Sequence, residues 1–383
     1  MAEPIRILQV IGIMNRGGAE AMIMNLYRHI DREKIQFDFV EHTTEKAAFD
    51  EEIISMGGKI YHCPKYTVTN HFQYCQWWNN FFLEHASEYS VVHGHIGSTA
   101  AIYLKIAKNY RMYTIAHSHN TKGKIGIKNL LYRCMSYPTR FISDYFFACS
   151  KQACIDRYGK KVSRDNSKHK ILNNAIDTKT YKYDTKTRNE CRKEFVLDNE
   201  IVIGHVGRFV IEKNHEFLVE VFRKILNNNK NVKLLLVGDG PLKKEVLQQV
   251  KTVGIQDNVI FAGIRSDVNR VLQRMDVFVM PSLFEGLPVS LVEAQATGLP
   301  CVISDTIPED CHITDLVSTL KLQDSTELWA EHILSRVKEI RKDYSPEIQK
   351  AGFDITETSK WLEEFYIEHS RESKTDSIYA SIQ

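Results

Sequence analysis

The sequence predicts an α/β protein built from two doubly wound domains in tandem. The chain has 383 residues, which is too long for one ordinary core and suits two. Both halves begin alike, with a continuous apolar run (IRILQVIGI at 5–13, IVIGHVG at 201–207), a loop and an amphipathic helix. Such runs are typical of parallel strands that are buried on both faces.

Further apolar runs predict the remaining strands. They lie near 37–40, 91–93, 112–116 and 145–148 in the first half, and at 232–238, 258–263, 276–282 and 300–305 in the second. A polar stretch without periodicity, 178–198, separates the two sets. We therefore expect an N-terminal domain over 1–180, a C-terminal domain over 195–356, and a helix at 357–370 that packs back on the N-terminal domain.

The composition excludes several classes of protein. With 43% hydrophobic and 26% charged residues, the chain is neither disordered, collagenous nor a disulfide scaffold. No apolar run approaches the roughly 18–20 residues that span a bilayer, and the start MAEPIRILQVIGI is a poor signal peptide. The eight cysteines form no CxxC pair, so we expect reduced thiols in a cytoplasmic protein.

The charge is unevenly distributed along the chain. Residues 1–190 hold 27 Lys and Arg against 18 Asp and Glu, whereas the remainder has a net charge of −7. The basic excess concentrates in 105–188, with 19 basic and 5 acidic residues. A basic face can bind nucleic acid, an anionic membrane or a phosphorylated ligand. Because no nucleic-acid recognition motif is present, we expect no nucleic-acid partner.

Ligands of open parallel sheets bind at the carboxyl ends of the strands, so the loops there carry the candidate site. Gly17 and Gly18 follow the first strand, where their amides could approach a phosphate, although a tight turn explains them equally well. Arg208 and Lys213 follow the strand at 201–207 and could hold a diphosphate in place of a divalent ion. The chain contains no DxD motif, so we expect no metal and no other cofactor.

The segment PSLFEGLPVSLVEAQATGLP at 281–300 is the most informative stretch. Glu285 lies in a loop after a strand, Gly286 permits a sharp turn, and Pro288 suits the first turn of the following helix. Glu293 is expected in the second turn of that helix. Free amides at the helix N-terminus can receive phosphate oxygens, and the two carboxylates can accept hydrogen bonds from pairs of sugar hydroxyls.

Two HxH patterns also lie at expected strand ends, His93 with His95 and His117 with His119. Such histidines can be structural, catalytic or metal-binding. Zinc is a possible ligand, but no carboxylate or cysteine completes either cluster locally.

The ordered set of motifs resembles family 4 of the retaining glycosyltransferases. The match covers about 5–370, and its motifs are RGGAE (16–20), VVHGHIG (91–97), AHSHN (116–120), LNNAID (172–177), VGRFVIEKNH (206–215), VGDGP (237–241), FAGIR (261–265) and EGLPVSLVEAQATGLP. The resemblance implies the metal-independent GT-B architecture, in which two Rossmann-like domains face each other across a cleft. The N-terminal domain would bind the acceptor and the C-terminal domain the nucleotide-sugar donor. Bacterial capsule and exopolysaccharide transferases are the most similar branch.

The resemblance also implies roles for the catalytic set. Glu285 matches the residue that binds the donor-sugar hydroxyls, and Arg208 and Lys213 match the pair that stabilises the leaving diphosphate. His117 matches the histidine near the anomeric centre, with His119 as the alternative. The usual Lys-Gly is Lys213-Asn214 here, which leaves the lysine intact.

The remaining matched residues would bind the substrate. Glu293 matches the ligand of the ribose, and Gly17 and Gly18 match the loop that closes on the phosphates. Other expected donor contacts are the base-binding Ile264 and Arg265, the cleft-lining Gly238 and Gly240, and the helix start at Gly286, Leu287, Pro288 and Val289.

The expected function is transfer of a hexose, with retention, from a UDP-sugar to a saccharide acceptor that is lipid-linked. Residues 122–141 interleave five basic residues (Lys122, Lys124, Lys128, Arg133, Arg140) with apolar ones (Ile125, Ile127, Leu130, Leu131, Phe141). They could lie on the inner face of an anionic plasma membrane, or form a solvated helix with its apolar side in the core. Two alternatives are a non-catalytic, nucleotide-sugar-binding partner subunit of a two-component transferase and a GT-B nucleotide-sugar epimerase.

Overall fold

The computed structural model describes residues 3–15, 17–119, 127–195, 197 and 199–380, without the side chains of 127–129 and 371–380. The chain divides into two compact units. The first unit comprises Met1–Ala175 with Ile355–Gln383, and the second comprises Ile176–Asp354. Each unit contains one parallel sheet, which confirms the predicted fold class.

The first unit is built on a seven-stranded sheet with the order β3-β2-β1-β4-β5-β6-β7. All its pairings are parallel, and the order reverses between β1 and β4, as in doubly wound folds. The strands are β1 (Ile5–Ile11), β2 (Ile35–Glu41), β3 (Ile60–His62), β4 (Tyr89–Gly94), β5 (Tyr113–Ser118), β6 (Tyr145–Ala148) and β7 (His169–Ile171).

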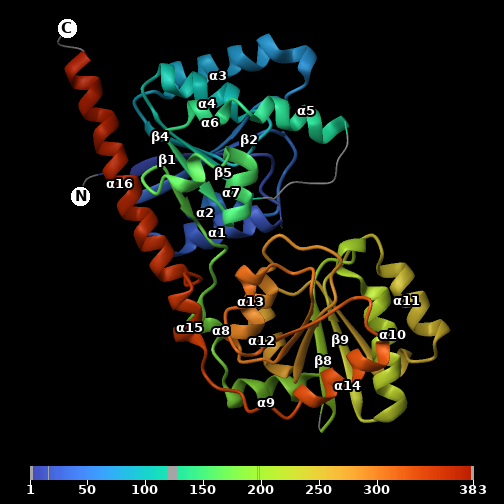
Figure 1. Ribbon diagram of the computed structural model, residues 1–383. Helices are drawn as coiled ribbons and strands as arrows, with labels where there is room; N and C mark the ends of the chain where they lie inside the picture. The colour runs from blue at the N-terminus through green and yellow to red at the C-terminus, as the bar shows by residue number, and fades with distance from the viewer. Residues whose placement is uncertain (1–2, 16, 120–126, 196, 198, 381–383) are drawn as a thin grey trace. The chain divides into compact units, whose positions relative to one another are not determined.

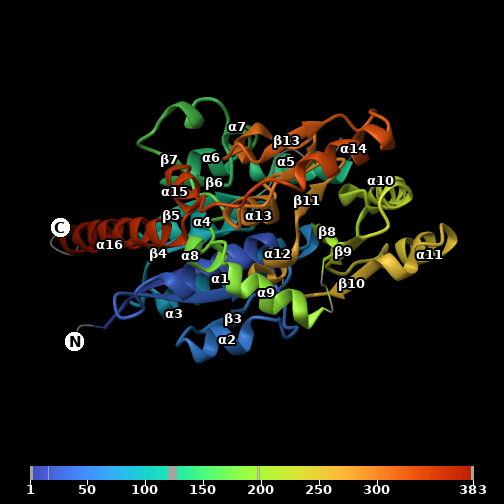
Figure 2. The ribbon, with the colours of Figure 1, turned by 90° about the horizontal axis from the view of Figure 1, so that it is seen from below.

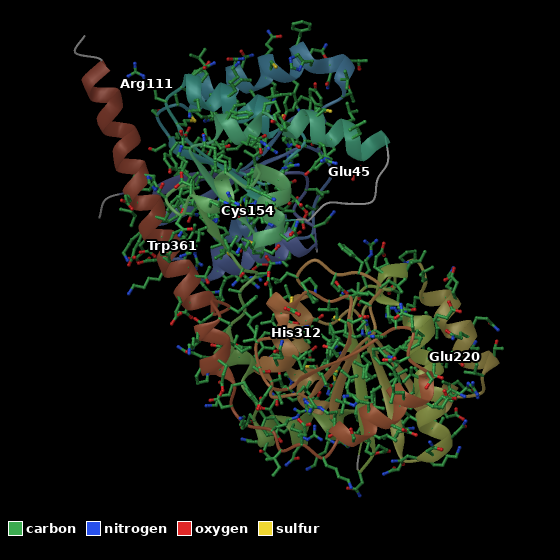
Figure 3. The ribbon with its side chains drawn as sticks, in the orientation of Figure 1. Glu45, Arg111, Cys154, Glu220, His312 and Trp361 are labelled. Atoms are coloured by element: carbon green, nitrogen blue, oxygen red, sulfur yellow. The ribbon has the colours of Figure 1, made fainter. Side chains whose placement is uncertain are left out.

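Helices cover both faces of this sheet (Figure 1). One face packs against α1 (Gly18–His29), α2 (Asp50–Ser55) and the C-terminal α16 (Ile355–Ala380), and the other against α3 (His71–His85), α4 (Ala100–Asn109) and α7 (Lys151–Tyr158). Helices α5 (Ile127–Ser136) and α6 (Thr139–Ile142) complete the unit. The helix expected over 357–370 is α16, which contacts α1 and β4 (Figure 2). Its Trp361, labelled in Figure 3, packs against Phe147 with ring centroids 6.0 Å apart.

The second unit has a six-stranded parallel sheet with the order β10-β9-β8-β11-β12-β13. Its strands are β8 (Ile201–Val206), β9 (Val232–Val237), β10 (Val259–Gly263), β11 (Val277–Met280), β12 (Cys301–Ser304) and β13 (Val317–Leu320). Its helices are α8 (Thr178–Tyr181), α9 (Thr185–Glu194), α10 (His215–Asn228), α11 (Lys243–Thr252), α12 (Val268–Arg274), α13 (Val289–Ala296), α14 (Thr326–Arg336) and α15 (Ser345–Lys350). The polar stretch at 178–198 therefore carries two helices, α8 and α9.

Three strands were not predicted from the sequence, and all three lie at the edges of the sheets. They are β3, β7 and β13. Each has three or four residues that are mostly half-buried, so the continuous apolar runs of the central strands are missing. None of the helices within the described ranges is long and apolar enough to cross a membrane.

Candidate functional site

In the second unit, three neighbouring strands bring the predicted donor residues to one edge of the sheet. Strands β9, β8 and β11 are adjacent, so the loops that follow them meet at their carboxyl ends. The loop after β8 carries Arg208 and ends in a 3₁₀ turn, Ile211–Lys213, before α10. The amide of Leu283 donates to the carbonyl oxygen of Glu212 at 2.7 Å, which ties the β11 loop to this turn.

Lys213 and Glu285 form an ion pair at this edge. The Nζ of Lys213 lies 2.6 Å from Oε1 of Glu285, and the hydroxyl of Ser282 donates to the same oxygen at 2.6 Å. The side chains are only 16% and 11% exposed, so water screens the pair less than a surface ion pair. Oε2 of Glu285 has no hydrogen-bond partner in the part of the chain that is described, so it can accept from a ligand.

Arg208 lies on the same loop with its side chain exposed. No described acidic residue pairs with its guanidinium, in contrast to Lys213. An exposed, unpaired guanidinium keeps its forked donors available for an anion.

Asn214 follows Lys213 at a position where the backbone conformation favours glycine but also admits asparagine. Its φ is +54°, in the left-handed region, where asparagine is the best tolerated residue after glycine. Its Nδ2 donates to the carbonyl oxygen of Pro281 at 3.1 Å, which joins the β8 loop to the β11 loop.

Gly238 and Gly240 allow the β9 loop to pack tightly on the β8 loop. A Cβ on Gly238, whose φ is +135°, would lie 2.1 Å from the carbonyl oxygen of Gly207. A Cβ on Gly240 would lie 2.5 Å from the carbonyl oxygen of Phe209. Both glycines are therefore required by close backbone contact.

Helix α13 starts one residue later than predicted. It spans Val289–Ala296, and Pro288 is its N-cap, so the expectation that Pro288 lies in the first turn is wrong. Proline has no side-chain acceptor, so it leaves the first amides of the helix uncapped. Gly286 and Leu287 lead into this helix start and are half-buried.

Glu293 lies in the second turn of α13, as expected from the sequence. Its Oε1 accepts a hydrogen bond from the hydroxyl of Tyr181 at 2.6 Å. Burial raises the pKa of the Glu293 carboxyl, and the bond from Tyr181 partly opposes that rise. Tyr181 belongs to α8, in the stretch that showed no periodicity, so the sequence offered no sign of this contact.

Ile264 and Arg265 follow β10, at the edge of the same sheet. Ile264 is 63% exposed, so its apolar surface is available to a ligand. The guanidinium of Arg265 forms a two-pronged pair with Asp267, at 2.7 and 2.6 Å. Arg265 is therefore fixed in place and partly neutralised.

In the first unit, Gly17 and Gly18 form the connection between β1 and α1. Gly17 is the N-cap of α1 and has no side chain to cap the helix. A Cβ on Gly18 would meet nothing within 4 Å, so the space beside this residue is empty. The carboxylate of Glu20 lies against Gly17, so a phosphate that approached this helix N-terminus would have to displace it.

His93, His95, His117 and His119 form a cluster of two hydrogen-bonded pairs at the carboxyl ends of β4 and β5. Nε2 of His93 lies 3.2 Å from Nδ1 of His117, and Nδ1 of His95 lies 2.8 Å from Nε2 of His119. Burial holds the pKa of each imidazole well below its usual value, to about 4 for His119. The four rings are therefore neutral at pH 7.

Three of these histidines also offer nitrogens close enough for a metal ion. Ligand atoms of His93, His95 and His117 lie within 4.8 Å of one another. Most of the facing nitrogens already take part in hydrogen bonds, so a metal ion would have to break that network. Zinc at this cluster stays a hypothesis.

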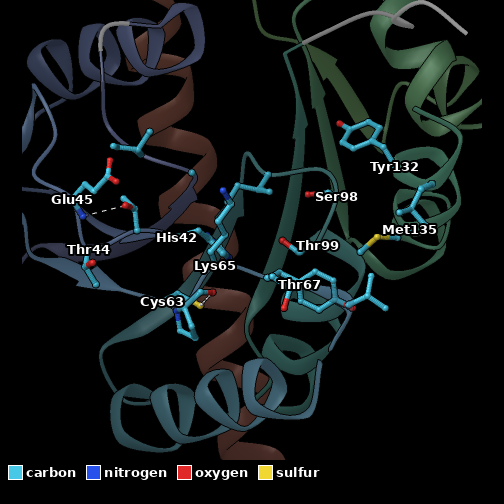
Figure 4. Close-up of a pocket in the computed structure, with 18 residues that line it drawn as sticks. His42, Thr44, Glu45, Cys63, Lys65, Thr67, Ser98, Thr99, Tyr132 and Met135 are labelled. Carbon is cyan, nitrogen blue, oxygen red and sulfur yellow. Dashed lines mark hydrogen bonds between the residues drawn. The ribbon is translucent and has the colours of Figure 1, made fainter. Parts of the chain in front are cut away.

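A cavity of about 880 Å³ opens beside the sheet of the first unit (Figure 4). Its walls come from the loops after β1, β2, β3 and β4, together with α5. Polar side chains such as His42, Glu45, Lys65 and Thr99 line it on one side, and Tyr132 and Met135 of α5 on the other. This cavity could not be predicted from the sequence, because five segments that are far apart in the chain contribute its lining.

Three apolar side chains of α5 and α6 are largely exposed, whereas Met135 and Ile142 are half-buried. Leu130, Leu131 and Phe141 are 62%, 52% and 74% exposed. The alternative in which this segment turns its apolar side to the core is therefore wrong for these residues. Lys122, Lys124 and Ile125 lie outside the described residues, as do the side chains of Ile127 and Lys128.

Comparisons with known proteins place this chain in a family. Residues 200–338 match the family model described as glycosyl transferases group 1. A protein named as a glycosyltransferase, EpsF of Bacillus subtilis (strain 168), is 35% identical over 337 residues, which cover 86% of each chain. The chain is a group 1 glycosyltransferase.

This glycosyltransferase is also similar to another curated relative and to a solved structure. The UDP-Gal:alpha-D-GlcNAc-diphosphoundecaprenol alpha-1,3-galactosyltransferase of Escherichia coli is 32% identical over 167 residues, 42% of each chain. The crystal structure of Anabaena Alr3699/HepE in complex with UDP-glucose superposes with a TM-score of 0.69 at 17% identity, covering 98% of this chain and 99% of that one. The likeness to the solved structure shows that the glycosyltransferase has the GT-B fold, as the family resemblance implied.

The predicted residues of this glycosyltransferase fall into two groups. The second unit gathers the phosphate, sugar and ribose candidates at the ends of β8, β9 and β11. The first unit gathers the histidines and the Gly17-Gly18 turn at the ends of β1, β4 and β5. Tyr181, Ser282, Gln9 and Tyr366, which contact members of these groups, were not predicted.

Proposed function

We propose that this glycosyltransferase moves a hexose, without a metal ion, from a UDP-sugar to a saccharide acceptor and retains the anomeric configuration. The observation that carries the proposal is the shielded Lys213–Glu285 pair beside the unpaired Arg208. One cation and one carboxylate held together suit a donor in which a diphosphate adjoins a sugar. In this assignment the second unit binds the donor and the first unit the acceptor.

The leaving diphosphate gains negative charge as the glycosidic bond breaks. Arg208, Lys213 and the uncapped N-terminus of α13 supply fixed positive charge and N–H donors to meet it. A donor that reaches Lys213 competes with Glu285 for the ammonium and frees that carboxylate for the sugar hydroxyls. Donor binding and sugar recognition are thereby coupled through one ion pair.

We assign Glu293 to the ribose and Ile264 with Arg265 to the base. The neighbouring structure of HepE in complex with UDP-glucose supports a uridine nucleotide. A carboxylate accepts hydrogen bonds from both hydroxyls of a ribose, and Tyr181 holds Glu293 in place for that role.

The acceptor is assigned to the cavity in the first unit. The cavity is lined by polar loops on one side and by α5 on the other, and α5 carries the exposed Leu130 and Leu131. A polar saccharide attached to a lipid would fit this change from polar to apolar surface. The relative named for a diphosphoundecaprenol substrate supports a lipid-linked acceptor. We assign the transfer to bacterial capsule or exopolysaccharide synthesis, as the family resemblance implies. We accordingly place residues 122–141 against an anionic membrane surface, with the protein at the inner face.

Thermal unfolding in EDTA with a panel of nucleotide diphosphate sugars tests the donor. A ligand at 100 times its Kd adds about 2.7 kcal/mol, a clear rise in Tm. Lys213→Met should abolish the rise, whereas Lys251→Met, on the exposed side of α11, should keep it. A rise that requires added Mg²⁺ or Mn²⁺ would contradict the metal-independent site, and no rise under any condition would favour the partner-subunit alternative.

The stereochemistry is tested on the product. We expect same-face attack, with the departing phosphate taking the proton of the acceptor hydroxyl, so an α-linked donor should give an α-linked product. NMR of the anomeric proton and carbon reads the linkage. A β-linked product would overturn retention, and release of free UDP with an interconverted sugar but no transfer would point to an epimerase.

A further inference from the structure

The histidine cluster of the first unit is joined to two further buried side chains, Gln9 of β1 and Tyr366 of α16. Nε2 of His95 lies 2.8 Å from Oε1 of Gln9, and Nδ1 of His93 lies 2.7 Å from the hydroxyl of Tyr366. The amide nitrogen of Gln9 reaches the same hydroxyl at 3.4 Å. Gln9 and Tyr366 are each 1% exposed. Gln9 therefore joins two branches, His95–His119 directly and His93–His117 through Tyr366.

We propose that Gln9 and Tyr366 are positioning residues that hold His93, His95, His117 and His119 in one shared tautomer. The outer nitrogens of the two branches, Nε2 of His117 and Nδ1 of His119, then always form one donor and one acceptor. Both are buried and have no hydrogen-bond partner in the described parts of the chain. The number of donors and acceptors that each group carries determines these tautomers.

In the orientation that the structure shows, the oxygen of Gln9 faces His95, so His95 must donate from Nε2. Its Nδ1 then accepts from Nε2 of His119, which leaves Nδ1 of His119 as an acceptor. On the other branch the amide of Gln9 donates to Tyr366, and Tyr366 donates to Nδ1 of His93. His93 therefore donates from Nε2 to His117, which leaves Nε2–H of His117 as a donor. All four rings carry their proton on Nε2.

Rotation of the Gln9 amide by 180° reverses every bond. The amide nitrogen then donates to His95, and Tyr366 donates to the amide oxygen. All four rings now carry their proton on Nδ1, so His117 ends in an acceptor and His119 in a donor. One glutamine thus sets four tautomers together, and both orientations leave the two ends complementary.

A complementary, uncharged pair suits a hydroxyl group, which donates one hydrogen bond and accepts another. The rings of His117 and His119 stack with centroids 4.1 Å apart, so the two ends belong to adjacent rings. Because burial keeps the four imidazoles neutral, the pair offers no charge to a diphosphate. We assign it to one hydroxyl of the transferred sugar or the acceptor, an assignment that rests on the proposed function.

The tautomers can be measured directly on the full chain labelled with ¹⁵N-histidine, at pH 8. Long-range ¹H–¹⁵N correlations separate protonated from unprotonated ring nitrogens, and single His→Asn variants identify each ring. We expect the four histidines to share one tautomer in the wild type. A mixture of tautomers among them would overturn the inference.

Gln9→Glu gives the sharpest test because a carboxylate accepts but cannot donate. Glutamate would accept from Nε2–H of His95 and from the hydroxyl of Tyr366, so Tyr366 would have to accept from Nδ1–H of His93. His95 and His119 should then be protonated on Nε2, and His93 and His117 on Nδ1. Gln36→Glu, the same change at another buried glutamine of this unit, should leave a single tautomer. An unsplit set in Gln9→Glu, with the new carboxyl shown by its ¹³C shift to be ionised, would overturn the inference.

Tyr366→Phe provides a second variant if Gln9→Glu does not fold. Loss of the hydroxyl should change the nitrogen shifts of His93 and His117 and spare those of His95 and His119. Equal changes on both branches, or no change on either, would contradict the two-branch arrangement.

Kinetics test whether the pair is used. Gln9→Glu leaves two acceptors at the outer nitrogens, so the substrate loses one hydrogen bond, and kcat/KM should fall about tenfold relative to Gln36→Glu. Split tautomers with unchanged kcat/KM would overturn the assignment to a hydroxyl. A wild type with no transfer activity would instead contradict the proposed function and leave the tautomer result intact.

Discussion

At the scale of single residues, the proposed donor site depends on positions where a side chain would not fit. Gly240 lets the β9 loop lie against the backbone of Phe209, and Gly238 does the same at Gly207. Asn214 takes a left-handed conformation between Lys213 and α10. These backbone requirements hold Arg208 and Lys213 at the end of β8.

Gly240→Ala should destabilise the second unit by about 1–3 kcal/mol, because the new methyl group meets backbone that cannot move aside. Denaturant unfolding measures the loss. Gly286→Ala is the matched control, since a Cβ there meets nothing within 4 Å. Equal losses in the two variants would show that the contact with Phe209 carries no cost.

Asn214→Gly should change stability little, because relief of the left-handed backbone offsets the lost bond to Pro281. Asn214→Val should cost about 1–3 kcal/mol, because a β-branched residue is strained at φ +54°. Thermal unfolding of the two variants side by side gives the difference. A valine variant as stable as the glycine variant would contradict the left-handed backbone at this position.

At the scale of elements, helices α13 and α8 together form the proposed ribose-binding site. Helix α13 contributes Glu293, and α8 contributes the tyrosine that fixes it. The two helices are in contact, although more than 100 residues separate Tyr181 from Glu293 in the sequence. Their packing therefore determines both the orientation of the carboxylate and its pKa.

Tyr181→Phe should weaken UDP binding about tenfold and make it more sensitive to acid. Burial raises the pKa of Glu293, and the hydroxyl of Tyr181 opposes that rise, so its loss moves the pKa further up. Binding should then weaken at a higher pH than in the wild type as the pH falls. Calorimetry from pH 8 to 5.5 measures this, with Tyr183→Phe from the same segment as control. Identical pH profiles would contradict the role of Tyr181.

At the scale of the whole molecule, buried neutral histidines should make the first unit less stable than the second at acidic pH. Burial lowers the pKa of five histidines in the first unit, namely His42, His93, His95, His117 and His119. In the second unit it strongly lowers the pKa of His205 and His215. Since the folded pKa lies below the unfolded value, the unfolded chain binds more protons below about pH 6.5 and stability falls there.

We expect the first unit to unfold before the second as the pH falls from 6.5 toward 4. A histidine whose pKa drops to about 4, such as His42 or His119, contributes up to about 3 kcal/mol of this loss. Hydrogen exchange of the full chain at pH 8 and pH 5 locates the first unit to open. Earlier opening of residues 176–354, or equal protection at both pH values, would contradict the expectation.

The sequence alone determined the fold class and named most residues of the proposed donor site. Long apolar runs marked the central strands because both faces of a parallel sheet are buried, and this signal is local. Arg208, Lys213, Glu285 and Glu293 could be predicted because they lie in two short segments that follow strands. Edge strands such as β3 and β13 carry no such signal, since pairing with a neighbour defines them.

Only the tertiary structure decided which groups from distant segments meet. The bond from Tyr181 to Glu293, the cavity beside α5 and the connection of four histidines through Gln9 and Tyr366 each join segments far apart in the chain. Composition and spacing report what a segment can do by itself. Hydrogen bonding between buried groups depends on the packing of strands and helices, because each donor inside the protein must find an acceptor there.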